Sequence, residues 1–201
     1  MEKKNLEFCF KGERTYVQGP DIFDSVIQNI LTDYDISEVK NIKYAAYALL
    51  KSNANLYFTE TLRKSDYKVI NSIISFIYKD KKISAVVEAN DEKIECSQEY
   101  SEEVIRTNSI IENKLISFEN ILDDSLTEII VSMNKYYLQE SVTKDGKWIV
   151  TKFDYSKILD IKKLKKKVIH LKLLNNFNNK LTKSVIIVDD IEVGYLYFGL
   201  V

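Results

Sequence analysis

The chain has 201 residues, of which 45% are hydrophobic and 29% charged, a balance that is typical of a folded globular protein and excludes global disorder. Its 29 Lys and Arg against 30 Asp and Glu leave a formal net charge of -1, which favours neither nucleic acid nor a membrane surface as a partner. The 5 glycines and 1 proline are too few for long disordered linkers or glycine-rich phosphate loops.

The first predicted elements are an extended stretch over 14–17 and a helix that follows from about Pro20. Proline fits the first turn of a helix because its missing N–H needs no partner there. The one-sided apolar stripe of this helix predicts that it packs on a sheet. Its apolar residues recur at helical spacing: Phe23, Val26, Ile27, Ile30 and Leu31.

A run of strands is predicted after this helix. Segment Tyr44–Lys51 is compatible with a helix or a strand, and its correspondence with Lys135–Val142 favours a strand. The later segments are rich in β-branched and aromatic residues, and the charged stretch Lys79–Lys82 is typical of a turn between two strands. We expect these strands over Leu56–Glu60, Val69–Tyr78 and Ile83–Glu88.

The polar, helix-compatible segment Ser97–Asn113 is the predicted connection to a second set of elements. An extended stretch over 114–118 precedes a second helix, which Asp123 or Asp124 caps. Strands follow, with Asn175–Asn179 as an asparagine-rich turn. The apolar positions of the helix are Leu126, Ile129, Ile130 and Met133, and the strands are expected over Trp148–Lys152, Val168–Leu174, Leu181–Val188 and Ile191–Leu200.

The two sets of elements indicate an internal repeat. Asp24-Ser25 and Asp124-Ser125 lie at an offset of about 100 residues, and each pair leads into a helical pattern. The order of strand, helix and four strands occurs twice, with Leu56–Glu60 matched to Trp148–Lys152. The sequence therefore predicts an α+β fold with a first unit over 1–98, a linker over 99–113 and a second unit over 114–201. The alternative is an accidental repeat in another α+β sandwich.

This layout resembles the hot-dog fold, in which a curved antiparallel sheet wraps around a central helix. Two copies in one chain resemble a tandem (double) hot-dog. The resemblance implies an acyl-thioester ligand on coenzyme A or acyl carrier protein, no separate cofactor, and a site near the N-terminus of a central helix. It also implies a monomer or a homo-oligomer, because a double hot-dog already contains its own pair of units.

The start of the first helix is the best candidate site. Gly19 allows a ligand to approach the backbone closely, Gln18 can donate to a carbonyl oxygen, and Asp21 can act as a general base. Tyr16 completes the predicted substrate contacts. The alternative is ordinary helix-start chemistry, in which Gly19-Pro20 turns the chain and Asp21 complements the helix dipole.

His170 is the single histidine and lies within a predicted strand of the second unit. It is a candidate general base; the alternative is an exposed or hydrogen-bonded strand residue. Dehydratases of the hot-dog type carry a histidine in a His-Phe-Pro context before the central helix, and this chain has no histidine before either predicted helix.

The two cysteines, Cys9 and Cys96, lack the spacing of a metal or redox pair and are too few for a disulfide framework. No apolar run approaches the roughly 20 residues of a membrane span, and the first residues do not resemble a signal peptide. We therefore expect a cytoplasmic protein with reduced thiols and no bound metal. The basic run Lys162–Lys167 is interpreted as a solvated bend, or alternatively as a phosphate contact for coenzyme A.

Two functions follow as hypotheses. The first is an acyl-thioester binding protein or an enzyme of the thioesterase or dehydratase type. The second is a non-catalytic protein-binding or accessory module, which the absence of any paired catalytic motif favours.

Overall fold

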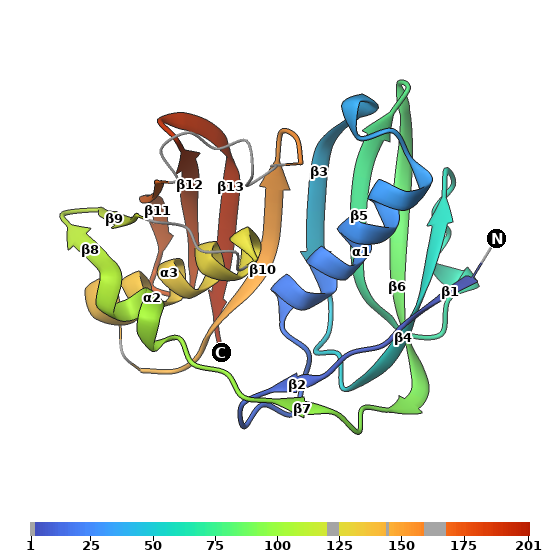
Figure 1. The fold of residues 1–201 in the computed structure, drawn as a ribbon, viewed down its shortest axis with the longest axis horizontal. Coiled ribbons are helices and arrows are strands. Elements are labelled where there is room, and N and C mark those ends of the chain that lie inside the picture. Colours follow the sequence, from blue (N-terminus) through green and yellow to red (C-terminus); the bar gives the residue numbers. More distant parts are fainter. Residues whose placement is uncertain (1–2, 120–124, 144, 159–167) are drawn as a thin grey trace. The chain divides into compact units, whose positions relative to one another are not determined.

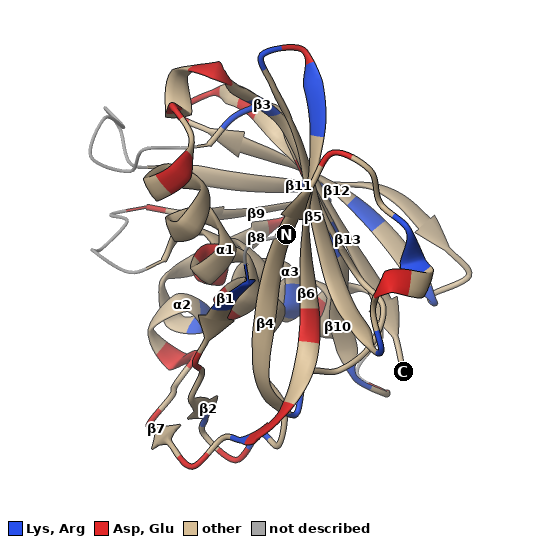
Figure 2. Ribbon diagram, turned by 90° about the vertical axis from the view of Figure 1, so that its right-hand side faces the viewer, with Lys and Arg blue, Asp and Glu red and all other residues tan. Residues whose placement is uncertain are grey.

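Two helix-and-sheet units, Met1–Ser101 and Glu102–Val201, make up the chain (Figure 1). The computed structural model describes residues 3–119, 125–143, 145–158 and 168–201. Each unit pairs an antiparallel sheet with one long helix, so the predicted α+β class is confirmed. Acidic and basic residues both occur at many places on the described elements in Figure 2. Within the described ranges, no helix has the length and hydropathy needed to cross a membrane.

The sheet of the first unit has the strand order β1-β4-β6-β5-β3, and every neighbouring pair is antiparallel. Two short 3-10 helices, η1 (Ile36–Glu38) and η2 (Lys64–Asp66), lie in its connections. The predicted strands over 56–60, 69–78 and 83–88 all lie in this sheet. Its strands are β1 (Lys3–Leu6), β3 (Val39–Ala46), β4 (Ser52–Thr59), β5 (Ile70–Tyr78) and β6 (Lys81–Lys93).

The long helix of this unit is α1 (Gly19–Asp33), with Pro20 in its first turn as predicted. Its apolar stripe is buried, and each such side chain contributes about 1.5–3 kcal/mol when removed from water. Phe23 packs edge-on against Tyr44 of β3, with ring centroids 6.2 Å apart. The prediction was wrong for Leu31, which is 38% exposed because it lies at the margin of the stripe in the last turn. The buried residues are Pro20, Ile22, Phe23, Val26, Ile27 and Ile30.

The sheet of the second unit has the order β10-β13-β12-β11-β9-β8, again antiparallel throughout. The segment 99–113, expected as a linker, contains a short helix, α2 (Glu103–Asn108), and the strand β8 (Ser109–Glu112). The predicted strands over 181–188 and 191–200 are confirmed at both ends. The remaining strands are β9 (Leu115–Phe118), β10 (Trp148–Tyr155), β11 (Ile169–Phe177), β12 (Leu181–Val188) and β13 (Ile191–Leu200).

Helix α3 (Leu126–Ser141) is the long helix of the second unit. Its N-cap is Ser125, whose Oγ accepts a hydrogen bond from Glu128 N at 3.1 Å. The predicted caps, Asp123 and Asp124, lie outside the described residues. Asn134 joins the helix to β12, because Ser184 Oγ donates to Asn134 Oδ1 at 2.8 Å.

The residue-by-residue repeat is wrong in three places. Asp24-Ser25 lies inside α1, whereas Ser125 precedes α3. Segment Lys135–Val142 belongs to the last turns and C-cap of α3 and is not a strand. Its supposed counterpart Tyr44–Lys51 is a strand only as far as Ala46, the end of β3. The predicted stretch over 14–17 forms no strand and makes one bridge, Val17 to Leu50.

The strand match was also shifted. Leu56–Glu60 lies in β4, the second strand after α1, but Trp148–Lys152 lies in β10, the first strand after α3. The first strand after the helix pairs with β5 in one unit and with β13 in the other. The coarse order of strand, helix and four strands nevertheless occurs in both units.

Tight turns join the last strands of each sheet, with two residues between β5 and β6 and between β12 and β13, and three residues, Asn178–Lys180, between β11 and β12. Two residues of each turn have a left-handed backbone, with φ between 46° and 66°, as two-residue hairpin turns require. Asn and Asp tolerate this region well. The residues concerned are Lys79-Asp80, Asn178-Asn179 and Asp189-Asp190.

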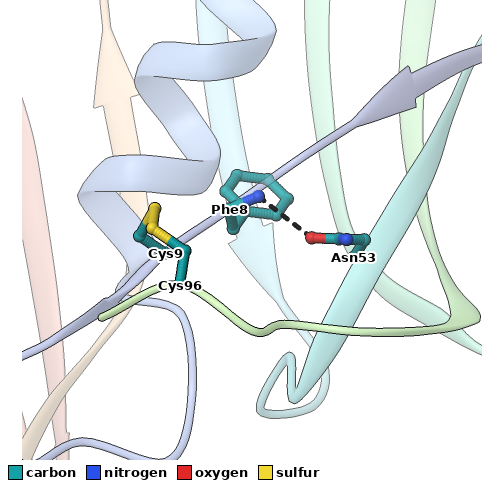
Figure 3. The surroundings of a disulfide bond; sticks show 4 residues. All are labelled: Phe8, Cys9, Asn53 and Cys96. Carbon is teal, nitrogen blue, oxygen red and sulfur yellow. Dashed lines mark hydrogen bonds between the residues drawn. A yellow bond between two sulfur atoms is a disulfide. The ribbon is translucent and has the colours of Figure 1, made fainter. Parts of the chain in front are cut away.

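The cysteines form a disulfide bond between Cys9 and Cys96 (Figure 3), so the expectation of two separate thiols was wrong. They are 87 residues apart in sequence, but their Cα atoms lie 4.6 Å apart. The reason is a short parallel pairing of β2 (Phe10–Lys11) with β7 (Ser97–Gln98), which begins one residue after each cysteine.

Candidate functional site

Helix α1 begins after Gln18, whose own side chain makes no capping hydrogen bond. Gln18 is the N-cap residue, and Ile22 N closes the first turn by donating to Gln18 O at 3.2 Å. Pro20 has no N–H to offer. A helix start of this kind carries partial positive charge and first-turn N–H groups, which suit a carbonyl oxygen or an anion.

Gln18 adds a second donor at the same place. The side chain is 9% exposed, and its Nε2 is buried with no hydrogen-bond partner among the described residues. A buried amide donor left without an acceptor costs about 1–3 kcal/mol. A ligand carbonyl oxygen at the start of α1 would remove this cost.

Asp21 forms an ion pair in the first turn of α1. Lys11 Nζ donates to Asp21 Oδ1 at 2.7 Å, and the two side chains are 18% and 20% exposed. Lys11 also lies over the ring of Tyr100, at 5.5 Å from its centroid, and Arg14 lies over the same ring at 4.6 Å. Asp21 therefore anchors β2 to the helix and places a carboxylate beside Gln18.

The other two predicted contacts flank Gln18. Val17 N donates to Leu50 O at 2.8 Å, which fixes the chain between Tyr16 and Gln18. Tyr16 is half-buried, and Gly19 is the first residue of α1. Four of the five predicted site residues thus lie together at one helix start.

His170 belongs to the second unit, on β11. Its Nδ1 lies 2.7 Å from Ser117 Oγ on the neighbouring strand β9, and the ring is half-buried. The hydroxyl fixes the ring orientation, which is the arrangement expected of a hydrogen-bonded strand histidine and is also compatible with a base.

A buried polar cluster on β5 was missed in the sequence. Asn71 and Ser72 are 1% and 0% exposed although they begin an isoleucine-rich strand. Asn71 Nδ2 donates to Ala48 O at 2.6 Å, while its Oδ1 is buried without a hydrogen-bond partner among the described residues. Burial raises the pKa of Tyr44, and the neighbouring Ser72 hydroxyl lowers it in part. Two polar residues within an apolar run were the signal available.

A hollow of about 450 Å³ lies at the opposite end of α1, where Tyr34 is the C-cap. Tyr34, Phe58 and Tyr78 line it, and burial, followed by the charge of Asp33, raises the pKa of Tyr34. Lys79 Nζ already lies 5.2 Å from the Tyr78 ring centroid. The Lys79 side chain therefore partly covers the aromatic wall of this hollow.

The described residues hold no group of three or more His, Cys, Asp or Glu side chains that could bind a metal. The basic run Lys162–Lys167 lies outside the described residues, so its contribution to phosphate binding stays a prediction.

No family model and no curated protein matches the sequence. Solved structures do match the fold. A thioesterase II from Thermobifida fusca has a TM-score of 0.54 at 5% identity, covering 98% of this chain and 95% of its own. A monomeric dehydratase domain from a trans-AT polyketide synthase split module has a TM-score of 0.51 at 10% identity, covering 100% of both chains.

The dehydratase domain of PpsC from Mycobacterium tuberculosis, in complex with C12:1-CoA, has a TM-score of 0.55 at 5% identity and covers 99% of this chain and 92% of its own. The predicted double hot-dog fold is thereby confirmed, and at these identities the similarity concerns the fold alone.

Proposed function

We propose that the protein binds an acyl thioester, carried on coenzyme A or acyl carrier protein, with the acyl carbonyl at the start of α1. The observation that carries this proposal is Gln18 Nε2, a buried donor at the helix N-cap that has no hydrogen-bond acceptor among the described residues. A thioester carbonyl supplies the missing acceptor. The PpsC dehydratase domain, which shares the fold, is in complex with C12:1-CoA.

The same geometry supports hydrolysis of the thioester. Gln18 Nε2 and the first-turn N–H groups would stabilise the oxyanion that forms when water adds to the carbonyl carbon. Asp21, in the first turn of the same helix, would take the proton from that water. The intermediate then collapses, the C–S bond breaks, and the thiolate leaves and takes up the proton. His170, oriented by Ser117, is the alternative base.

A non-catalytic accessory module is the second candidate. It is favoured by the ion pair itself, because Lys11 already occupies one carboxylate oxygen of Asp21. It is also favoured by the sequence at the start of α1, where Gln18-Gly19-Pro20 stands in place of a histidine-containing motif. A cytoplasmic location stays a prediction that has lost its support from the cysteines, because disulfide bonds persist mainly in oxidising compartments.

Calorimetric titration with saturated acyl-CoA esters tests binding, and free coenzyme A is the ligand control. Replacing the donor in Gln18→Leu should weaken acyl-CoA binding by about tenfold or more. The matched control is Gln28→Leu on the exposed face of the same helix. Equal acyl-CoA affinities in wild type and Gln18→Leu would show that the acyl carbonyl does not bind beside Gln18.

Release of free thiol from acyl-CoA separates the two functions. Hydrolysis that Asp21→Asn abolishes and His170→Gln leaves intact supports the enzyme with Asp21 as base. Binding without any thiol release supports the accessory module.

A further inference from the structure

The disulfide closes a short structure that we call the strap, residues 9–12 and 96–98 (Figure 3). Phe10 N donates to Cys96 O at 3.0 Å, and Gly12 N donates to Gln98 O at 2.9 Å. The paired strands β2 and β7 have two residues each. Such a short pairing has few hydrogen bonds, so the covalent bond adds a strong restraint between the two segments of the strap.

The strap reaches the candidate site through Lys11. This residue belongs to β2, two positions after Cys9, and its ammonium group pairs with Asp21 in the first turn of α1. The pair is about four-fifths buried on both sides. A continuous set of contacts therefore leads from the disulfide to the residue beside Gln18.

A reductant can reach the disulfide from solvent, because Cys96 is exposed while Cys9 is half-buried. A dithiol is the chemical class required. Its thiolate attacks Cys96 Sγ and forms a mixed disulfide, and Cys9 leaves as a thiolate that takes up a proton. The second thiol of the reductant then attacks the reductant's first sulfur, which is bonded to Cys96 Sγ in the mixed disulfide. This step releases Cys96 as a thiol. Two electrons and two protons pass to the protein, and the dithiol becomes a disulfide.

We propose that the Cys9–Cys96 disulfide is a redox switch that sets the order of the α1 start through the Lys11–Asp21 ion pair. In the oxidised protein the strap holds Lys11 against Asp21. After reduction the strap frays, Lys11 leaves the carboxylate, and the first turn of α1 loosens. For ligand binding the inference rests on the proposed function, and it then predicts weaker acyl-thioester binding in the reduced form.

Amide hydrogen exchange tests the switch without any ligand. It compares the oxidised protein with the dithiothreitol-reduced protein at a temperature below the unfolding transition of both. The amides of Ile22 and Phe23 should exchange about tenfold faster after reduction, while those of β12 and β13 stay unchanged. Lys11→Met should reproduce this increase with the disulfide intact. The matched control is Lys4→Met, which removes an ion pair to Asp33 at the other end of the same helix and should leave the first turn protected.

Acyl-CoA titration of the same samples gives the second readout, with an expected loss of about tenfold in affinity on reduction and in Lys11→Met. Should neither redox state bind acyl-CoA, the proposed function fails while the exchange data still decide on the switch. The switch is overturned if reduction leaves the first turn of α1 unchanged. It is also overturned if reduction accelerates exchange uniformly over the whole first unit, because the disulfide would then serve stability alone.

Discussion

At the scale of single residues, Gly194 shows how closely two strands approach. A Cβ atom at this position of β13 would lie 2.1 Å from Asp154 O on β10, a distance that only a shift of the backbone can relieve. At Gly199 on the same strand, a Cβ would lie 3.2 Å from the Thr151 Cγ2 methyl, which can move.

We therefore expect Gly194→Ala to lower the free energy of unfolding by about 3 kcal/mol or more, and Gly199→Ala by about 1 kcal/mol or less. Urea unfolding of the two variants measures the difference. Equal losses would show that β10 and β13 separate without cost.

Tyr44 should make stability depend on alkaline pH. Because burial raises its pKa in the folded protein, the unfolded chain ionises first, at a pKa near 10. The stabilisation is therefore complete below about pH 10 and is lost as the pH rises further, with a slope of about 1.4 kcal/mol per pH unit.

Tyr44→Phe should cost about 1 kcal/mol or less near neutral pH, and the deficit should shrink above about pH 10, because phenylalanine does not ionise. Chemical unfolding at several pH values checks this expectation. Tyr47→Phe, at a 55% exposed position, is the control. A stability difference between wild type and Tyr44→Phe that stays constant with pH would contradict a raised pKa of Tyr44 in the folded protein.

The sequence predicted residues of the site unevenly. Gln18 and Asp21 were singled out as candidates because a single Gly-Pro pair stands at the start of a strongly periodic helix. The ion pair of Asp21 with Lys11 could not be found, because it depends on how the strap folds back. The polar pair Asn71-Ser72 was missed because strand periodicity reports apolar faces and not the polar atoms buried among them.

At the scale of elements, the two long helices begin in different ways. Helix α3 has a side-chain cap, Ser125, whereas Ser25, its counterpart in the predicted repeat, lies inside α1. Helices and hairpins with strong local patterns were predicted well, as β12 and β13 show. The strands β2 and β7 were not, since two residues carry no periodicity and their pairing depends on distant parts of the chain.

Replacing each serine with alanine tests this difference. Ser125→Ala should lower the free energy of unfolding by about 1 kcal/mol through the lost cap. Ser25→Ala should change it by less than about 0.5 kcal/mol, because alanine is the better helix former inside a helix. Thermal or urea unfolding measures both. A larger loss for Ser25→Ala would contradict the helix bounds.

At the scale of the whole molecule, one coarse layout is built twice with different details. Each unit contains a long helix that follows at least one strand and precedes at least four. The first strand after the helix pairs with the third strand after the helix in one unit and with the fourth in the other. The layout could be predicted because element types follow from local sequence. The strand pairing could not be predicted, because the choice of partner strand depends on long-range packing. The few residue identities between the two copies carry little information about that packing.

Under the proposed function, an acyl-thioester carbonyl lies at the start of α1 and accepts a hydrogen bond from Gln18. Infrared difference spectroscopy of acyl-CoA carrying a ¹³C-labelled thioester carbonyl observes that group directly. Wild type should bind the ester and shift the carbonyl stretch to lower frequency, and Gln18→Leu should lose most of the shift while Gln28→Leu keeps it. A bound ester with the same carbonyl frequency in all three proteins, or no binding to wild type, would contradict the claim.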